Sequence, residues 1–482
     1  MVRAIATGGW SERGFWLTTP VAIALVVNGA GLGAQDKPTS SLAPKAAAIH
    51  RILADRVDRD RQGVGIVAGV YEATGPRTVV YGRLQQGGPP VSPTTTFEVG
   101  SITKVFTALL LADMVQRGEV ALDDPVARYL PPDVRVPERG RAITMEDLAT
   151  HRSSLPADPP NLHPKDPANP LADYTVADLS AFLSGYVLPT DVGTRYEYSN
   201  VGVALLGLAL AQRAGHSYAD LIHDRIAVPL GLSRTRVGIG PEPSLEFAPG
   251  HSYLLEPVPN WTMPAFEASG GLISSADDLL AFLSAMLRYR QTPLAGAMAL
   301  MTRTRRPAND PSRETALGWD VLILEPGYEF LFKDGATGGY RSFLAFDESS
   351  RTGVVVLSNA ATRAGVVDIG MHVLNPEIPL DPLKGRIPAP KPTAAPGPAV
   401  LARYGGAYTL GPGDTLTVTV EGNRIFEQRS GQLKVELFAE DARRFYCRLF
   451  DEQVEFVVAA SGIPSSLVFT ENGERHRAVR AK

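Results

Sequence analysis

Cysteine is almost absent from this chain of 482 residues, because Cys447 is the only one. No disulfide can therefore form within the chain, and no cysteine pair can hold a zinc ion. The eight histidines are scattered, and we expect neither a metal nor another cofactor. The net charge is −4 with both signs interspersed, which offers no basic stripe for nucleic acid and no polybasic patch for a membrane. We therefore expect no nucleic-acid partner.

The apolar run near the N-terminus is short. Residues 1–34 contain two arginines, an apolar run from about Phe15 to Val27 that Pro20 interrupts, and small residues ending at Ala34. This arrangement predicts a signal peptide at 1–34. The run falls short of the roughly 20 residues that cross a bilayer. We expect an exported protein, periplasmic or secreted, with no stable membrane insertion after cleavage; an uncleaved N-terminal anchor is the alternative.

Strand patterns flank a helical middle. A helix is predicted at 46–60, strand-like runs follow at 64–72 and 78–84, and helical patterns dominate from 101 to about 287. Later strands are predicted at 317–324, 328–333, 341–346 and 352–357, before a last helix near 361–374. One antiparallel sheet, assembled from both ends of a domain at 46–380 and flanked by helices, buries these faces most simply. The predicted class is α+β, with a mostly helical subdomain.

The character of the chain changes after residue 380. Residues 381–399 are rich in proline and alanine, which predicts a semi-rigid linker. From 400 to 482, short alternating segments are separated by turn signals such as Gly422-Asn423 and Asn472-Gly473. This pattern predicts a small all-β barrel or sandwich. We find no catalytic constellation in it.

Lysine is the second scarce residue, with nine lysines against 38 arginines. Between residues 46 and 380 the only lysines are Lys104, Lys165 and Lys333. Arginine stays protonated, whereas a buried lysine can lose its proton and act as a base. Lys165 lies in a proline-rich loop, where a solvated side chain is the simpler interpretation. The other two lysines call for a chemical explanation.

Ser101-Ile102-Thr103-Lys104 is the only Ser-x-x-Lys in the chain, and it opens a segment that predicts a buried helix. Residues three apart share a helix face, so the Lys104 amine can reach the Ser101 hydroxyl. The helix N-terminus also offers N–H groups to a developing anion. This spacing is typical of an activated serine nucleophile.

Two further motifs follow in order, Tyr198-Ser199-Asn200 and Lys333-Asp334-Gly335. We expect the second of them to open a strand late in the domain. With Ser-x-x-Lys, they resemble the penicillin-recognising serine hydrolases, and more narrowly class C β-lactamases and related DD-peptidases and esterases. The resemblance covers roughly residues 46–375. More faintly, the C-terminal unit resembles lipocalin-like domains appended to some exported relatives, through residues 428–432.

The resemblance implies a role for each of these residues. Ser101 would be the nucleophile, Lys104 its proton partner, and Tyr198 the base that passes the proton to the leaving group. A tyrosine could serve only if Lys104 and Lys333 hold its phenolate. Asn200 would orient Lys104 and the substrate amide. The oxyanion hole would use the backbone N–H groups of Ser101 and of Ala336, which follows Gly335. His151 would be structural.

One departure from the family pattern bears on substrate choice. Asp334 stands where the family usually has a threonine or serine that helps bind the carboxylate of a penicillin or of a D-Ala-D-Ala terminus. An aspartate would repel that carboxylate by about 4 kcal/mol at 4 Å with an effective dielectric near 20. Asp334 pointing away is the other reading, so neutral esters and amides remain open.

The predicted function is β-lactam hydrolysis through an acyl-enzyme on Ser101. D-alanyl-D-alanine carboxypeptidase or endopeptidase action and carboxylesterase action are alternatives of the same fold. A penicillin-binding sensor that acylates once without turnover is the alternative from another class, because no motif reports a deacylating water. The expected partner is a small molecule, namely a β-lactam, a D-Ala peptide or an ester, with peptidoglycan as a further candidate.

Overall fold

The computed structural model describes most of residues 43–481. The stretches outside the description are 1–42, 241–245, 326, 382–395, 412–413, 430–433, 448–451, 460–461, 472–473 and 482. The described chain up to Asp381 forms one compact unit, and the chain from Pro396 onward belongs to another. The predicted signal peptide and most of the predicted linker lie outside the described residues, so those boundaries stay predictions.

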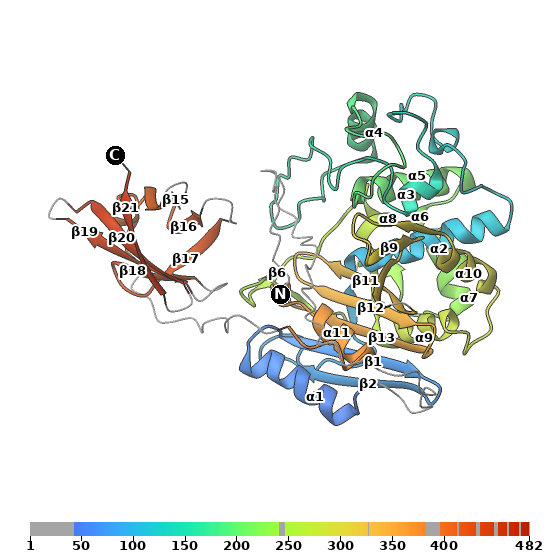
Figure 1. Cartoon of the computed structure of the whole chain (residues 1–482), viewed down its shortest axis with the longest axis horizontal. Coiled ribbons are helices and arrows are strands. Elements are labelled where there is room, and N and C mark those ends of the chain that lie inside the picture. Colours follow the sequence, from blue (N-terminus) through green and yellow to red (C-terminus); the bar gives the residue numbers. More distant parts are fainter. Residues whose placement is uncertain are drawn as a thin grey trace. The chain divides into compact units, whose positions relative to one another are not determined.

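An eight-stranded antiparallel sheet forms the centre of the first unit (Figure 1). Its order is β2-β1-β13-β12-β11-β10-β9-β8. The strands are β1 (Gly65–Glu72), β2 (Gly75–Gly82), β8 (Arg305–Pro307), β9 (Arg313–Ala316), β10 (Asp320–Glu325), β11 (Tyr328–Ala336), β12 (Arg341–Asp347) and β13 (Thr352–Ser358). The first strand of the unit pairs with its last, from Ile66 opposite Ser358 to Tyr71 opposite Gly353. The predicted assembly of one sheet from both ends of the domain is confirmed.

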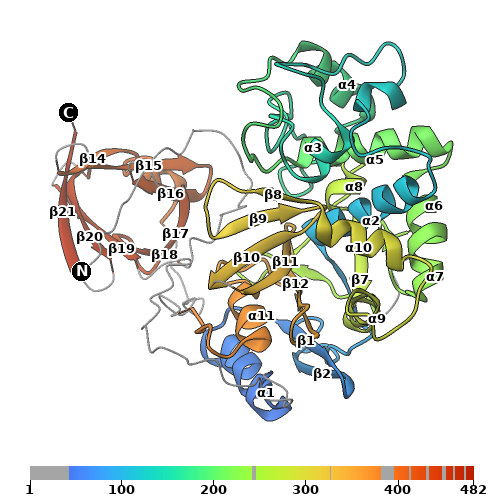
Figure 2. The same cartoon turned by 45° about the vertical axis from the view of Figure 1, so that its right-hand side comes forward.

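Helices cover both faces of this sheet (Figure 2). On one face, α1 (Ala46–Ala54) and α11 (Val367–Leu374) bury an aliphatic and aromatic core against alternate residues of β1, β11, β12 and β13. On the other face, α9 (Ala276–Met286) packs so closely on β1 that a Cβ at Gly69 would lie 2.7 Å from Leu280. Because side chains alternate along a strand, Lys333 of β11 faces away from the core that contains Phe330 and Phe332.

A helical subdomain lies beside the sheet. Its central helix, α2 (Thr103–Gln116), is buried over nearly its whole length. Around it lie α3 (Met145–Ala149), α4 (Val176–Gly185), α5 (Asn200–Ala214), α6 (Tyr218–Ile222), α7 (Val228–Leu230), α8 (Glu267–Gly270) and α10 (Ala295–Arg303). Threonine and aspartate form capping boxes at the starts of α3 and α4. The predicted helical middle is therefore confirmed. No helix in the described part of the chain has the length and apolarity to cross a membrane.

Short strands connect the subdomain to the sheet. β3 (Thr96–Glu98) and β4 (Arg236–Val237) pair with opposite edges of β7 (Leu272–Ser275), and β5 (Gly250–His251) pairs with β6 (Pro257–Val258). Because β3 ends at Glu98, only Val99 separates it from Gly100, and its pairing with β7 fixes the approach to the Ser-x-x-Lys motif.

The second unit is a closed barrel in which each strand pairs with the next and the last pairs with the first. The strands are β14 (Gly406–Gly411), β15 (Asp414–Glu421), β16 (Arg424–Arg429), β17 (Val435–Ala439), β18 (Arg444–Cys447), β19 (Glu452–Val458), β20 (Pro464–Glu471) and β21 (Glu474–Arg480), after a short α12 (Pro398–Leu401). Alternate side chains, among them Tyr408, Phe456 and Phe469, fill the interior. The predicted small β-barrel is confirmed, with the eight-stranded up-and-down topology of lipocalin-like folds.

Three predicted boundaries need correction. The last helix of the first unit begins at Val367 and not near residue 361, because Gly365 takes a left-handed φ of +58° just before it. The α-helical part of the first helix ends at Ala54 and continues as a π-helical turn at Asp55–Arg59. Lys333-Asp334-Gly335 closes β11 and does not open a strand, since that strand starts at Tyr328.

Candidate active site

Ser101 lies on a 3-10 turn, Gly100–Ile102, between β3 and the start of α2. Thr103 holds this turn with one hydroxyl, which donates to the Gly100 carbonyl at 2.7 Å and accepts from the Leu272 N–H at 3.0 Å. Gly100 has a φ of +51°, and a Cβ there would lie 2.6 Å from the Ala336 nitrogen. Only glycine fits this conformation and this close approach without strain. The turn therefore lies backbone to backbone against the end of β11.

Lys104 reaches Ser101 from the first turn of α2. Its side chain is buried, and its Nζ lies 3.0 Å from Ser101 Oγ, 2.8 Å from Asn200 Oδ1 and 2.6 Å from the Ser269 carbonyl oxygen. Burial, reinforced by the Lys333 cation, lowers the pKa of Lys104 well below its usual value. A neutral amine has two N–H groups and one lone pair. Its two N–H groups match Asn200 and Ser269, which leaves the lone pair to accept the Ser101 proton.

Tyr198 completes the contact from the other side, with its hydroxyl 2.6 Å from Ser101 Oγ. The Nζ atoms of Lys104 and Lys333 lie 5.0 and 4.9 Å from the centre of the tyrosine ring. Burial nevertheless raises the pKa of Tyr198 to about 12, although Lys333 and the Ser101 hydrogen bond oppose the shift. Lys333 does not outweigh burial, so the resting hydroxyl keeps its proton and can donate to Ser101.

Asn200 is fixed between Lys104 and Asp158. Its Oδ1 accepts from Lys104, and its Nδ2 donates to Asp158 Oδ1 at 3.0 Å. These two partners determine which way the amide faces. Asn200 begins α5, where Ser199 is the N-cap and accepts from the Gly202 N–H at 2.8 Å. The helix start therefore sets the position of both Tyr198 and Asn200.

His151 packs behind Tyr198, with ring centres 4.6 Å apart. Its Nδ1 accepts from the Ser199 N–H at 3.2 Å, so the ring proton belongs on Nε2. Burial and the two neighbouring lysines lower the pKa of His151 well below its usual value, so the ring is neutral. It packs on the tyrosine ring and binds the backbone beside it, and its structural role stays a prediction.

Lys333 lies at the end of β11, and its Nζ donates to Asp320 Oδ2 at 2.8 Å. The next glycine on the strand, Gly335, lies so close to the serine turn that a Cβ would be 2.1 Å from the Val99 carbonyl oxygen and 3.0 Å from the Ser101 nitrogen. Ala336 follows on the same strand, against Gly100. The backbone nitrogens of Ser101 and Ala336 thus belong to two segments in direct contact, as an oxyanion hole requires.

Asp334 lies on the opposite face of β11 from Lys333, level with Phe343 of β12. It is half-buried, and burial raises the pKa of its carboxyl although Lys333 and Arg341 oppose this shift. Asp334 still acts electrostatically on Lys104, Tyr198 and Lys333. It is therefore part of the charge environment of the site without sharing the face of Lys333.

The structure brings Ser101, Lys104, Tyr198, Asn200 and Lys333 together from three distant parts of the sequence. Sequence analysis missed the Ser269 carbonyl, Asp158 and Asp320. The first is a backbone atom, which no side-chain pattern reports. The two aspartates do not lie at a fixed spacing from any motif. The pairing of β10 with β11 places Asp320 beside Lys333, and the loop after Leu155 places Asp158 beside Asn200.

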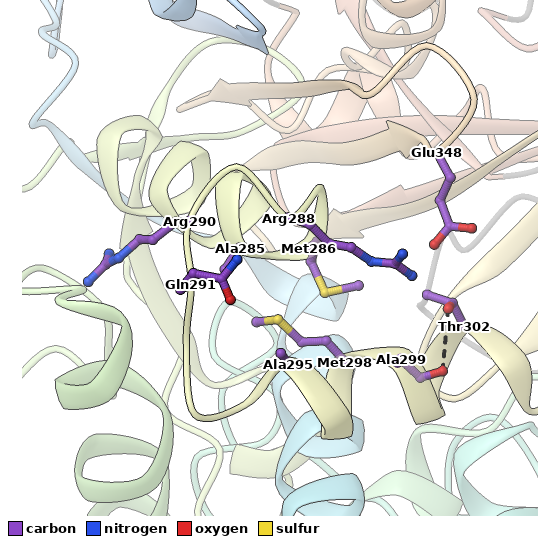
Figure 3. Close-up of a pocket in the computed structure, with 10 residues that line it drawn as sticks. All are labelled: Ala285, Met286, Arg288, Arg290, Gln291, Ala295, Met298, Ala299, Thr302 and Glu348. Atoms are coloured by element: carbon purple, nitrogen blue, oxygen red, sulfur yellow. Dashed lines mark hydrogen bonds between the residues drawn. The ribbon is translucent and has the colours of Figure 1, made fainter.

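A separate pocket of about 110 Å³ lies away from these residues (Figure 3). It is lined by the end of α9, the loop that follows, α10 and Glu348. None of the predicted site residues lines it. Among the residues that the structure describes, no group of three or more histidine, cysteine, aspartate or glutamate side chains could hold a metal ion.

Comparison with known proteins gives consistent relatives. The profile of the family described as Beta-lactamase matches residues 49–371. Penicillin-binding protein 4* of Bacillus subtilis (strain 168) is 26% identical over 416 residues, covering 82% of this chain and 89% of that protein. D-alanyl-D-alanine-carboxypeptidase/endopeptidase AmpH of Escherichia coli (strain K12) is 28% identical over 295 residues, covering 58% and 75%. A crystal structure of a class C beta lactamase from Rhodobacter sphaeroides has a TM-score of 0.56 and 28% identity, and covers 65% of this chain and 93% of that one.

Proposed function

Because this chain belongs to the Beta-lactamase family, we propose that it is a serine hydrolase that forms an acyl-enzyme on Ser101. The observation that carries the proposal is the position of Ser101 Oγ, 3.0 Å from a buried lysine amine and 2.6 Å from a tyrosine hydroxyl. Both distances are within hydrogen-bond reach of the nucleophile. Lys104 acts as the base, since its pKa is lowered, and Tyr198 acts as the acid, since its pKa is about 12.

Acylation follows from these roles. Ser101 Oγ forms a bond to the substrate carbonyl carbon, and its proton passes to Lys104 Nζ. The negative charge that develops on the carbonyl oxygen is held by the N–H groups of Ser101 and Ala336. The bond to the leaving group then breaks as Tyr198 donates its proton, which the Lys104 ammonium replaces. In deacylation, water attacks the acyl carbon and loses its proton to the same pair. The bond from the acyl carbon to Ser101 Oγ then breaks, and Oγ takes a proton back from that pair.

The substrate is an ester or an amide. β-Lactam hydrolysis, predicted from the sequence, stays one of three candidates beside D-alanyl peptide cleavage and carboxylic ester hydrolysis. Relatives named as a beta-lactamase and as a D-alanyl-D-alanine carboxypeptidase support the first two. All three share the acyl-enzyme on Ser101. A sensor that acylates without turnover uses the same acylation and lacks the second step.

Export belongs to the same proposal, as does a division into a hydrolase domain at 46–380 and a barrel domain at 400–482. Substrates outside the cytoplasm, including peptidoglycan fragments, are then within reach. Fractionation of cells that express the full chain tests this directly. Mature protein in the periplasm or medium that has lost about the first 34 residues supports export, and an intact N-terminus in the cytoplasm refutes it.

The decisive experiment records intact-protein mass against time after mixing with a penicillin, a chromogenic cephalosporin or a p-nitrophenyl ester. Ser101→Ala serves as the matched control. We expect a transient adduct that is absent from the variant, together with release of product. A lasting penicillin adduct would indicate a D-alanyl peptidase or the sensor. Absence of any adduct and of any Ser101-dependent product from all three compounds would refute the proposed function.

A further inference from the structure

The lysine at the end of β11 already has a carboxylate partner. Lys333 Nζ donates to Asp320 Oδ2 at 2.8 Å, and the two side chains are only 4% and 19% exposed. Both groups are largely removed from water, so salt and solvent screen their attraction weakly. At the distance of a bound substrate, the pair acts as a dipole and not as a full positive charge.

The second lysine of the site does not supply the missing charge. Burial and Lys333 lower the pKa of Lys104, so its amine is neutral in the state that activates Ser101. Its Nζ is also in contact with Ser101, Asn200 and the Ser269 carbonyl. Neither lysine therefore offers an uncompensated cation to an anionic group on the substrate.

Carboxylates outnumber the available cations near the reacting atoms. Asp334 acts electrostatically on Lys104 and Tyr198, and Asp158 acts on Lys104 through a carboxylate that Asn200 holds at 3.0 Å. Arg341 offsets part of the charge of Asp334, and the carbonyl oxygens of Tyr340 and Ala361 hold its guanidinium in place. A further negative charge entering this site meets net repulsion.

We infer that Asp320 and Asp334 are specificity-determining residues, which make the site select esters and amides without a negative charge near the bond that breaks. This inference rests on the proposed function and narrows its substrate class. Penicillins and D-alanyl-D-alanine peptides carry a carboxylate close to the scissile bond, whereas carboxylic esters of neutral alcohols do not. Neutral esters and amides are therefore the preferred class.

Two matched pairs of compounds isolate charge from shape and reactivity. The first pair is methyl 3-acetoxybenzoate and 3-acetoxybenzoate, which share the acetyl group that would acylate Ser101. The second is benzylpenicillin methyl ester and benzylpenicillin. The measured quantity is the ratio of kcat/KM for the neutral member to kcat/KM for the anionic member, at low and at high salt, with Ser101→Ala subtracted.

The variants are Asp320→Asn, Asp334→Thr and Asp320→Glu, which keeps the charge. Asp224→Asn is the matched control, because it removes one carboxylate from a side chain that is 72% exposed. A variant that disturbs the catalytic groups changes kcat/KM for both members of a pair alike, so this change cancels in the ratio. Asp320→Glu also shows whether a change of side chain that lowers stability, without removing the charge, alters the ratio.

We expect the full-length protein to favour the neutral member at least tenfold in a pair that it hydrolyses, and added salt to change this preference little, because Asp320 and Lys333 are largely buried. Asp320→Asn should reduce the ratio by about tenfold and Asp334→Thr by a few-fold, while Asp320→Glu and Asp224→Asn leave it within twofold. A wild-type ratio near or below one, or an unchanged ratio in Asp320→Asn, overturns the inference alone. Absence of Ser101-dependent turnover of all four compounds overturns the proposed function with it.

Discussion

The glycine before the nucleophile offers the sharpest test of the geometry. In Gly100→Ala, the new Cβ would lie 2.6 Å from the nitrogen and 2.7 Å from the oxygen of Ala336, both backbone atoms that cannot swing aside. Ordinary contact begins near 3.4 Å, so the serine turn and β11 must separate by about 0.8 Å. The φ of +51° adds about 1 kcal/mol of backbone strain for alanine.

This separation would pull apart the N–H groups of Ser101 and Ala336, which we propose hold the carbonyl oxygen. Loss of one such donor costs roughly 100-fold to 1,000-fold in kcat, or about 2.7–4 kcal/mol. We therefore expect kcat for any Ser101-dependent substrate to fall at least about 100-fold in Gly100→Ala. Stopped-flow or mass-resolved acylation rates measure the loss directly, and circular dichroism checks that the variant is folded.

Gly118→Ala is the matched control. Gly118 has a φ of +71°, and a Cβ there meets nothing within 4 Å. It therefore carries the backbone strain without the collision, and it should lose about 1 kcal/mol of stability with unchanged kcat. A folded Gly100→Ala whose kcat stays within a few-fold of wild type would refute the placement of the oxyanion hole.

Three further predictions use other parts of the structure. Tyr198→Phe removes the hydroxyl 2.6 Å from Ser101 Oγ but keeps the ring on His151, so kcat/KM should fall about 100-fold to 10,000-fold with little change in melting temperature. A kcat/KM equal to that of the wild type would exclude a role of Tyr198 in proton transfer. Because the pKa of Lys104 is lowered, its neutral form is present below pH 10.5, so kcat/KM should rise with pH to a plateau reached below that value. Lys333→Met removes a cation that lowers this pKa, so it should move the rise in kcat/KM to higher pH. A rise that does not move counts against Lys104 as the base. Asp368→Ala leaves Arg56 buried without its carboxylate, so urea unfolding should show that the free energy of unfolding falls by about 3–5 kcal/mol. Arg59→Ala, which breaks an exposed pair, should lower it by well under 1 kcal/mol. Equally small losses in both variants would contradict the importance of burial.

Sequence spacing predicts those features that depend on one local period. Ser101 and Lys104 are neighbours because a helical turn brings residues three apart together, and the strand alternation predicts the sheet and the barrel. The pairing of β10 with β11, which brings Asp320 to Lys333, depends on a register between separate segments that no local pattern encodes. The Ser269 carbonyl is equally hidden, because any residue type could supply it. The pKa of Tyr198 depends on three-dimensional burial, which no local pattern in the sequence encodes.

The contacts around Ser101 support its proposed role as the nucleophile. Lys104 cannot relax away from it, because Asn200 and Ser269 hold the amine, and Asp158 in turn holds Asn200. Tyr198 cannot turn away easily, because His151 packs on its ring and binds the backbone of the next residue. Lys104 and the Tyr198 ring are thus held by partners other than the serine. Ser101 itself is only half-buried, so a carbonyl substrate can reach an oxygen whose proton acceptor and proton donor are already in position.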